Sequence, residues 1–416
     1  MHVHYPKIDT EGIIKEGPLK ANSKLSRLFI LCVVIGVVVF FGALFSSYPN
    51  KLLWGAYYTN FLFWMGLSLG MLMAAPIVQI VRAKWSPPIR RIAEAPSAFL
   101  PWLFLAFLAT WFGRKELFPW ARGPMPGREW WMREGFVYWR FSILFLILFY
   151  LFYRFVRLSL RSDIAVCRER AKDKWQGLSY VRLVKDWKGE GEIVEIQRKL
   201  SWNAPLLVVV YCIVITLFAT EMVVGMDTVW YSNMFGGFEF LGNIYMGWAS
   251  IALIGSYVAA RHSKFGEAFG RRQLWDLGML TFGFCMLWAY TFFAQFLAQW
   301  YGNMPEETQW LIVRTREFPW KGLSWVCFSF CFIIPFVVLL SEDVKKSPLA
   351  YVPTYLMVIV GIWLERYIIV MPQLSPGVIP FSIVEVGIFL GFLGVFGLCV
   401  QKFLSTYPIV PVSHPL

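Results

Sequence analysis

Residues 28–48, LFILCVVIGVVVFFGALFSSY, form an apolar stretch without a single charged side chain. A hydrocarbon core about 30 Å thick needs about 20 such residues in one helix. Comparable stretches recur along the chain, which is 58% hydrophobic and only 16% charged. The sequence therefore predicts an all-α integral membrane protein with about ten transmembrane helices. The expected spans are 28–48, 57–82, 98–113, 137–157, 204–225, 237–260, 276–301, 321–341, 349–371 and 377–402.

Lys and Arg are unevenly distributed between the loops. Of the 39, 28 lie in the N-terminal segment, alternate loops and the C-terminal tail, whereas 9 lie in the opposite loops. Because positive charge accumulates on the cytoplasmic side, both termini are expected in the cytoplasm. The expected parts are a cytoplasmic N-terminal segment (1–27), a ten-helix membrane domain (28–402) and a cytoplasmic tail (403–416). The net charge of +13 then reflects topology, with anionic lipid headgroups as counter-ions, and requires no nucleic-acid partner.

The longest loop on the expected cytoplasmic side is 154–203. From Ile164 to Leu183, apolar residues alternate with Arg and Lys. This pattern is typical of a helix that lies on the membrane surface, and we expect an interfacial helix here. A docking surface for a cytoplasmic protein is the alternative.

Histidine and cysteine usage bears on redox chemistry. None of the four histidines (His2, His4, His262 and His414) lies in an expected span, whereas a b-type haem needs axial histidines at bilayer depth. The seven cysteines form no CxxC or CxxCH motif, which argues against iron–sulfur and c-type haem attachment. We therefore assign no catalytic or metal-binding residue and expect any redox centre on partner proteins.

Ionisable and hydroxyl side chains occur at or near the spans. A charged group inside a bilayer is costly and needs a partner or a function. One interpretation is a proton path, whose candidate residues are Glu221, Asp227, Glu239, Asp276, Thr216, Thr220, Tyr290 and Glu385. The alternative is structural: the threonines bond to their own helix, the carboxylates lie at the interface, and Asp276 caps the start of a helix.

Two further features concern charges within spans. Glu365 and Arg366 are adjacent, and neighbouring residues point about 100° apart on a helix. Each is therefore expected to bond to another helix rather than to its neighbour. Glu385 has no evident local partner.

Several segments resemble a known family. The run WYGNMPEET (Trp300–Thr308) within 276–314, together with DTVWYSNMFGGFEFLGN (227–243), GIWLERYIIVMPQL (361–374), RRIAEAP (90–96) and LFPWARG (117–123), resembles the NrfD/PsrC-like membrane subunits of alternative complex III. The resemblance implies ten helices, arranged as two four-helix bundles flanked by single helices. It also implies a quinol:electron-acceptor oxidoreductase complex in the bacterial cytoplasmic membrane.

The second span distinguishes the two membrane subunits of that complex. The larger, ActC-like subunit has a histidine there near its quinol site, whereas this chain reads FWMGLSLGML (63–72). The chain is therefore more similar to the smaller, ActF-like subunit, for which the family implies proton conduction. The implied partners are an ActC-like subunit, an ActB-like iron–sulfur subunit and a multihaem cytochrome c; these carry the haem c and the clusters, and menaquinone or another quinone is the electron donor.

Two alternatives remain open. The chain itself binds quinone, with Tyr138, Arg140 and Trp120 as headgroup ligands, because a quinone needs hydrogen-bond partners for both oxygens. Alternatively, the chain is a secondary transporter, although the sequence shows neither paired broken helices nor a clear inverted repeat.

Overall fold

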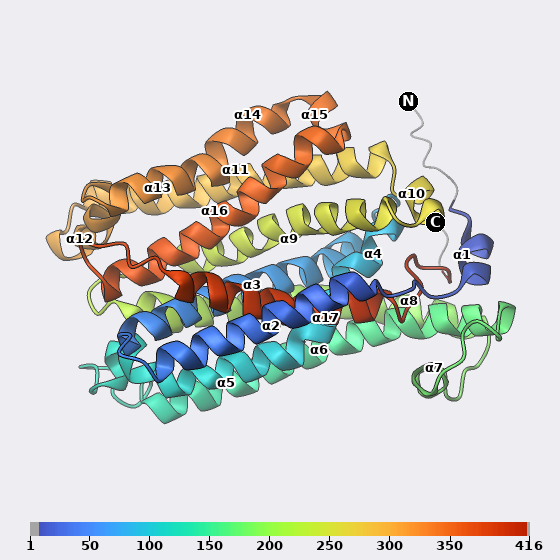
Figure 1. The fold of residues 1–416 in the computed structure, drawn as a ribbon, viewed down its shortest axis with the longest axis horizontal. Coiled ribbons are helices and arrows are strands. Elements are labelled where there is room, and N and C mark those ends of the chain that lie inside the picture. The colour runs from blue at the N-terminus through green and yellow to red at the C-terminus, as the bar shows by residue number, and fades with distance from the viewer. Residues whose placement is uncertain (1–7, 414–416) are drawn as a thin grey trace.

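The computed structural model describes residues 8–413, and within this range it contains helices and loops but no β-strand (Figure 1). The α-helices are α1 (Thr10–Glu16), α2 (Ser23–Leu44), α3 (Asn50–Ile80), α4 (Pro87–Glu94), α5 (Leu100–Leu117), α6 (Glu134–Arg170), α7 (Leu178–Leu183), α8 (Gly191–Phe218), α9 (Phe235–Ala259), α10 (Ser263–Ala268), α11 (Arg271–Gly302), α12 (Pro305–Thr315), α13 (Trp320–Phe328), α14 (Ile334–Leu340), α15 (Glu342–Lys346), α16 (Pro348–Leu374) and α17 (Ile383–Leu404). A 3₁₀ turn (Ala95–Phe99) joins α4 to α5, and π-helical turns extend α8 (Ala219–Val223) and join α13 to α14 (Ser329–Ile333).

Nine helical stretches within residues 8–413 are long and apolar enough to cross a membrane. They are α2, α3, α4 with α5, α6, α8 with its extension to Met226, α11, α13 with α14, α16 and α17. The chain is thus an all-helical, multi-pass membrane protein, as the sequence predicts. The remaining expected span, 237–260, corresponds to α9. This helix is long enough to cross a membrane, but it is less apolar than the nine stretches above. Glycine is common in α9, which also contains two serines and Asn243, and most of the helix is buried among its neighbours.

Close backbone contacts hold the centre of the bundle. The apolar part of α3 is 94% buried, and α3 crosses α9 where a Cβ on Gly70 would collide with the carbonyl oxygen of Asn243. A Cβ on Gly247 would likewise collide with the backbone of Gly70. The peripheral helices α2 and α17 approach equally closely at Gly36 and Gly391. Small residues permit such approaches between membrane helices, where packing drives association.

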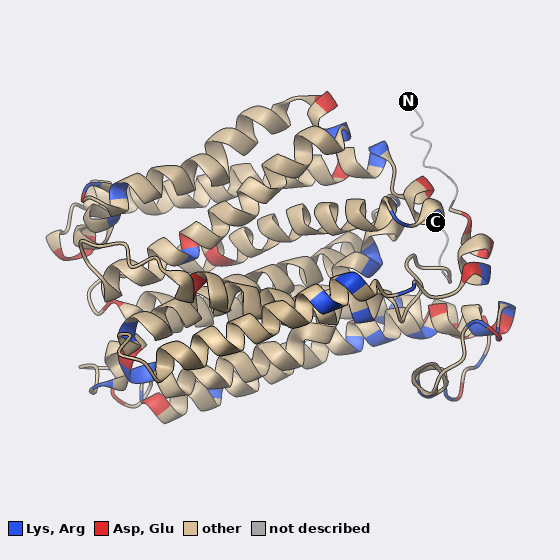
Figure 2. Ribbon diagram, viewed as in Figure 1, with Lys and Arg blue, Asp and Glu red and all other residues tan. Residues whose placement is uncertain are grey.

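We name the two ends of the bundle after the elements that lie there. Helices α1, α7, α10 and α15 and the residues after α17 lie at the terminal end, whereas α12 and the loop 118–133 lie at the α12 end (Figure 1). Charged residues gather at both ends and are sparse along the middle of the helices (Figure 2). This distribution follows from the cost of charge in an apolar medium.

The interfacial helix expected over 164–183 does not form. Helix α6 continues to Arg170, α7 is six residues long, and α8 begins at Gly191. Ile164, Val166 and Trp175 are instead buried within the protein, whereas Leu178 and Val181 are exposed. Trp175 donates its indole N–H to the carbonyl oxygen of Ile14, at 3.0 Å. The apolar pattern therefore reflects packing against α1 and the C-terminal residues.

The segments outside the spans also pack onto the bundle. In the expected N-terminal segment, α1 buries Ile13 and Ile14, and in the expected C-terminal tail Val410 and Val412 are buried. His262 is the N-cap of α10. The other three histidines, His2, His4 and His414, lie outside the described residues.

Candidate functional site

A buried ion cluster joins α9, α11 and α16. Arg366 is fully buried, and its Nη1 lies 2.5 Å from Glu239 Oε2 and 2.6 Å from Glu365 Oε1. Its Nη2 donates to Asn243 Oδ1 at 2.9 Å, and the Trp288 indole N–H donates to Glu365 Oε2 at 2.6 Å. One guanidinium therefore bridges two carboxylates and an amide from two helices, and an indole from a third helix holds one of the carboxylates.

The expectation that Glu365 and Arg366 each bond to another helix is confirmed, since Glu365 accepts from Trp288 of α11 and Arg366 bonds to Glu239 of α9. The expectation that the two do not pair with each other is wrong. Arg366 does bond to Glu239 on α9, but the same nitrogen also bonds to the neighbouring Glu365. An arginine side chain is long enough to reach a carboxylate that leaves the helix in another direction. The directions of the two Cα–Cβ bonds alone therefore do not decide whether the side chains pair.

The charge balance of this cluster is uneven. Two carboxylates share one guanidinium, so the cluster has one negative charge in excess when both carboxylates are ionised. Glu239 Oε1 and Arg366 Nε form no hydrogen bond of ordinary geometry within the described part of the chain. Because unbalanced buried charge is costly, a proton on one carboxylate would balance the cluster.

A narrow cavity of about 100 Å³ borders Glu365 on the side of the α12 end. Its walls are mainly aromatic, and its polar lining includes Gln295 and Gln299 of α11 and Arg314 of α12. Arg314 donates to the carbonyl oxygens of residues 368 and 369 on α16, at 2.9 Å each. Burial lowers the pKa of Arg314 to about 9, so it remains a positive charge beside the cavity at neutral pH. Glu365 is therefore the carboxylate of the cluster that contacts both the Arg366 guanidinium and this cavity.

A second ion pair lies nearer the α12 end, between Arg140 of α6 and Glu221 of the π-helical turn after α8. Trp131 donates its indole N–H to Glu221 Oε1 at 2.9 Å, and the Arg140 guanidinium lies 4.1 Å from the centre of a Trp131 ring. Glu221, a candidate for the proton path, is thus the ion-pair partner of Arg140, a candidate quinone ligand. π-Helical turns often mark functional sites.

The two hydroxyl candidates at the end of α8 lie one turn apart, and Thr220 bonds within its own helix. Thr220 Oγ1 donates to the carbonyl oxygens of Thr216 and Leu217, at 3.0 Å each. Thr216 packs its side chain against Gly236 at the start of α9. The bonds of Thr220 agree with the structural alternative for that residue, and among residues 8–413 neither threonine hydroxyl bonds to Glu221 or Glu239.

Asp227 shapes the loop between α8 and α9. Its Oδ1 accepts hydrogen bonds from the backbone N–H groups of Val229 and Trp230, at 3.0 and 3.3 Å. Its Oδ2 accepts from Gln373 Nε2 at 3.4 Å. This is an Asx-type turn, so Asp227 has a structural task outside the buried cluster.

Asp276 and Tyr290 both lie on α11, the helix that contains the expected span 276–301. The helix begins at Arg271 with Gly270 as its N-cap, so the expectation that Asp276 caps a helix is wrong. Asp276 Oδ1 lies 3.7 Å from Arg272 Nε, one turn earlier. The start of the apolar stretch in the sequence marks where the membrane-facing surface of the helix begins. The helix itself begins more than one turn earlier. Tyr290 is 64% exposed on the outer face of α11.

Glu385 has a local partner after all. Helix α17 begins at Ile383, and Glu385 Oε2 accepts from both the backbone N–H and the hydroxyl of Ser382, at 2.8 Å each. Ser382 Oγ in turn accepts from the backbone N–H of Val384 at 3.2 Å. This reciprocal arrangement is a capping box. The signal is visible in the sequence as Ser-x-x-Glu.

The three quinone-ligand candidates are divided between two groups. Tyr138 shares a 3.0 Å hydrogen bond with Thr110 Oγ1, and its ring centre lies 6.4 Å from that of Trp120. Arg140, two residues further along α6, is occupied by Glu221. None of the three lines the cavity beside Glu365.

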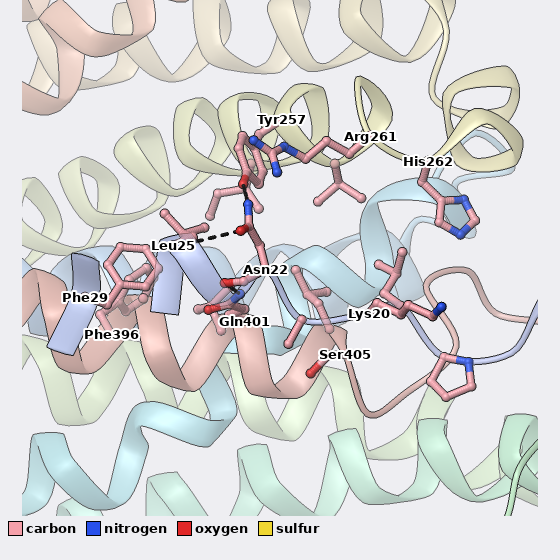
Figure 3. Close-up of a pocket in the computed structure, with 18 of the residues that line it drawn as sticks. Lys20, Asn22, Leu25, Phe29, Tyr257, Arg261, His262, Phe396, Gln401 and Ser405 are labelled. Atoms are coloured by element: carbon pink, nitrogen blue, oxygen red, sulfur yellow. Dashed lines mark hydrogen bonds between the residues drawn. The ribbon is translucent and has the colours of Figure 1, made fainter. Parts of the chain in front are cut away.

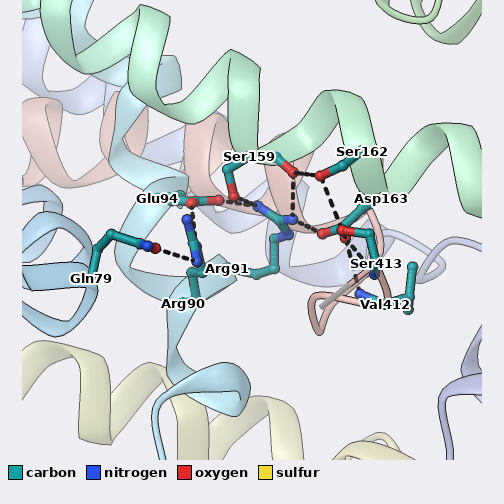
Figure 4. A network of polar contacts seen from close by, with 9 residues as sticks. All are labelled: Gln79, Arg90, Arg91, Glu94, Ser159, Ser162, Asp163, Val412 and Ser413. Atoms are coloured by element: carbon teal, nitrogen blue, oxygen red, sulfur yellow. Dashed lines mark hydrogen bonds and ion pairs between the residues drawn. The ribbon is translucent and has the colours of Figure 1, made fainter. Parts of the chain in front are cut away.

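A third charged cluster, at the terminal end, was not anticipated from the sequence (Figure 4). The Arg91 guanidinium lies between Glu94 and Asp163, and all three side chains are buried. Arg91 Nη1 also donates to Ser159 Oγ at 2.9 Å. The cluster ties α4 to α6 through Arg91 and Asp163, which are 72 residues apart in sequence.

The same cluster fixes the C-terminal residues. Asp163 Oδ1 accepts from the backbone N–H groups of Val412 and Ser413, at 3.1 and 2.8 Å (Figure 4). Asp163 therefore holds Arg91 with one oxygen and the end of the described chain with the other. The segment RRIAEAP contains two of the charges, but the third lies on another helix, so sequence spacing gave no sign of the cluster.

The sequence of this chain matches no family model and no curated protein.

Proposed function

We propose that this chain is a membrane subunit of a quinol:electron-acceptor oxidoreductase of the alternative complex III type, in which it provides part of a proton path. The observation that carries the proposal is the Glu239–Arg366–Glu365 cluster. Ionisable groups buried between membrane helices are costly and mark functional sites more often than structural ones. The resemblance of residues 227–243 and 361–374 to that family supports the same conclusion, because both segments contribute to the cluster.

In this proposal the cluster exchanges one proton. Arg366 keeps its charge and holds the two carboxylates in place, so a proton can move between Glu239 and Glu365 without leaving a charge unpaired. Glu365 borders the cavity with Gln295 and Gln299, whose amides can orient a hydrogen-bonded chain toward the α12 end. On the other side of the cluster, Tyr351, whose hydroxyl bonds to Ser256, lies one turn into α16 at the terminal end.

The proposed setting is the bacterial cytoplasmic membrane, with the terminal end in the cytoplasm. The excess of Lys and Arg at that end supports this orientation. Helix α9, which packs among α3, α8, α11 and α16, completes ten crossings. Two four-helix groups are supported by the helix contacts. Helix α3 contacts α5 and α8, whereas α11, α13 and α16 contact one another or α9. Helices α2 and α17 lie at the periphery. Haem c and iron–sulfur clusters belong in this proposal to ActB-like and cytochrome partners, and quinol oxidation to an ActC-like neighbour.

The decisive experiment measures protons moved per electron. The intact complex is reconstituted into liposomes with an entrapped pH-sensitive dye and driven with quinol. Glu239→Gln and Glu365→Gln should each lower the number of protons moved per electron while quinol oxidation continues. Asp227→Asn is the matched control, because asparagine preserves the Asx turn and the ratio should remain unchanged. An unaltered ratio in both cluster variants would contradict the proposal.

A second candidate function is favoured by one observation. The cavity beside Glu365 has aromatic walls and a few polar groups, the lining that is typical of sites for amphipathic small molecules. Its volume of about 100 Å³ is below the ~300–1,000 Å³ of such sites, so in this alternative the chain itself holds only part of a quinone headgroup there. A photoreactive quinone analogue would then label residues of α11 or α13 in this chain. Labelling confined to a neighbouring subunit would exclude this function and leave the proton path.

A further inference from the structure

A large cavity opens at the terminal end, between α2 and α17 on one side and α9 on the other (Figure 3). Its volume is about 1050 Å³, at or above the upper end of the ~300–1,000 Å³ that sites for small ligands occupy. The cavity lies well away from the Glu239–Arg366–Glu365 cluster, and none of the cluster residues lines it. It therefore requires an explanation of its own.

The deep part of the cavity is apolar. Phe29 of α2, Leu253 of α9 and Phe396 and Val400 of α17 line it. Figure 3 shows Phe29 and Phe396 at the end of the cavity opposite Lys20 and His262. An apolar slot between peripheral membrane helices fits a hydrocarbon chain.

The mouth of the cavity is polar and basic. Lys20 and Arg261 line it, and neither has a carboxylate partner within 4 Å among residues 8–413. The Arg261 guanidinium lies 4.5 Å from the Tyr257 ring centre, which holds it at the rim. The one acidic residue in the lining, Glu16, lies 3.5 Å from His262 Nε2. Two positive charges are thus available at the mouth.

We propose that this cavity binds one anionic phospholipid, with its phosphate between Lys20 and Arg261 and an acyl chain along Phe29 and Phe396. Basic pockets between membrane helices are typical sites for anionic headgroups. The positive end of the α2 dipole, at Ser23, adds to the attraction. A free phosphate would use only the mouth, and an apolar partner helix would leave both cations unpaired; only a lipid satisfies both parts of the cavity. The inference does not depend on the proposed function.

The test uses a phosphatidylglycerol that carries a photoreactive group on one acyl chain. The full-length protein is reconstituted, with its partners where they co-purify, into phosphatidylcholine vesicles that contain a trace of this probe, irradiated and mapped by mass spectrometry. Labelling is expected at Leu253 or Phe396, and a matched phosphatidylcholine probe should label these positions less. Lys20→Ala and Arg261→Ala should each reduce the labelling about fivefold, equivalent to about 1 kcal/mol. Leu253→Trp, which fills the apolar part, should reduce it without removing a charge.

The control is Lys402→Ala, which removes an exposed charge on α17 that does not line the cavity and should leave labelling unchanged. Equal labelling by both probes would identify ordinary surrounding lipid and overturn the proposal. Competition by glycerol phosphate without acyl chains would identify a free-phosphate site and also overturn it. Loss of labelling in the intact complex, with a crosslink from Leu253 to a partner protein, would show that a protein helix covers the cavity and would overturn it as well.

Discussion

Arg366 and Glu239 are 127 residues apart in sequence, yet Arg366 Nη1 lies 2.5 Å from Glu239 Oε2 in the interior of the bundle. Neither side chain has any exposed surface. A buried ion pair is weak evidence for stability in itself, because desolvation offsets much of the attraction. A function is suggested because the Arg366–Glu239 pair joins α16 to α9 and because a second carboxylate bonds to the same guanidinium.

The first prediction concerns the charge of Arg366. Arg366→Met removes the only cation of the cluster and leaves two buried carboxylates, which should destabilise the protein by about 3–5 kcal/mol. The addition of Glu239→Gln to this variant should recover part of the loss, because one carboxylate is then neutral. Thermal unfolding in detergent, followed by tryptophan fluorescence, measures both changes.

The control for this comparison is the exposed pair Lys199–Glu195 on α8. Lys199→Ala should change stability by less than about 1 kcal/mol, as for surface pairs in general. If Arg366→Met proved no more harmful than Lys199→Ala, the cluster would not be a structural ion pair at all.

The second prediction concerns the crossing of α3 and α9. Gly70→Val should prevent normal folding, because a Cβ at this position collides with the carbonyl oxygen of Asn243, and backbone cannot yield as a flexible side chain does. Gly283→Ala on α11 meets open space and should be neutral or stabilising by up to about 1 kcal/mol. The yield of monodisperse protein from gel filtration distinguishes the two, and equal yields would argue against a close crossing.

The helices could be predicted from sequence because their signal is local. The apolar stretch 28–48 corresponds to α2 (Ser23–Leu44), and 349–371 to α16 (Pro348–Leu374). The length of an apolar stretch directly reflects the thickness of the membrane. The capping box of Ser382 and Glu385 was equally local and could have been recognised from its Ser-x-x-Glu spacing.

The pairing of charges could not be predicted, because it depends on which helices are neighbours. Glu239 was identified as a candidate, but its partner Arg366 follows from the packing of α9 on α16. The same holds for Arg91 and Asp163. The surface helix expected near Trp175 failed for a related reason: a buried face looks the same in sequence whether it contacts lipid or another part of the protein.

The third prediction separates capping from proton conduction at Glu385. Glutamine also completes a capping box, so Glu385→Gln should preserve both stability and the number of protons moved per electron. Glu385→Ala removes the cap and should cost about 0.5–2 kcal/mol. Unfolding measurements and the liposome assay test the two variants together. A lower proton ratio in a stable Glu385→Gln protein would return this residue to the proton path.

The fourth prediction concerns the double role of Asp163. Ser413→Pro removes one backbone N–H and one hydroxyl that bond to Asp163 Oδ1, since proline has no N–H. This loss should cost about 1.5–3 kcal/mol, because the acceptor is charged. Asp163→Ala should cost more, because it also removes a partner of the buried Arg91.

Because both substitutions act on one carboxylate, their effects should not add. In the Asp163→Ala background, Ser413→Pro has little left to remove, so the coupling between the two should reach about 0.5–3 kcal/mol. Thermal unfolding of the two single variants and the double variant measures this coupling. Additive costs would mean that the C-terminal residues are held by their apolar contacts, such as those of Val410 and Val412, and that Asp163 serves Arg91 alone.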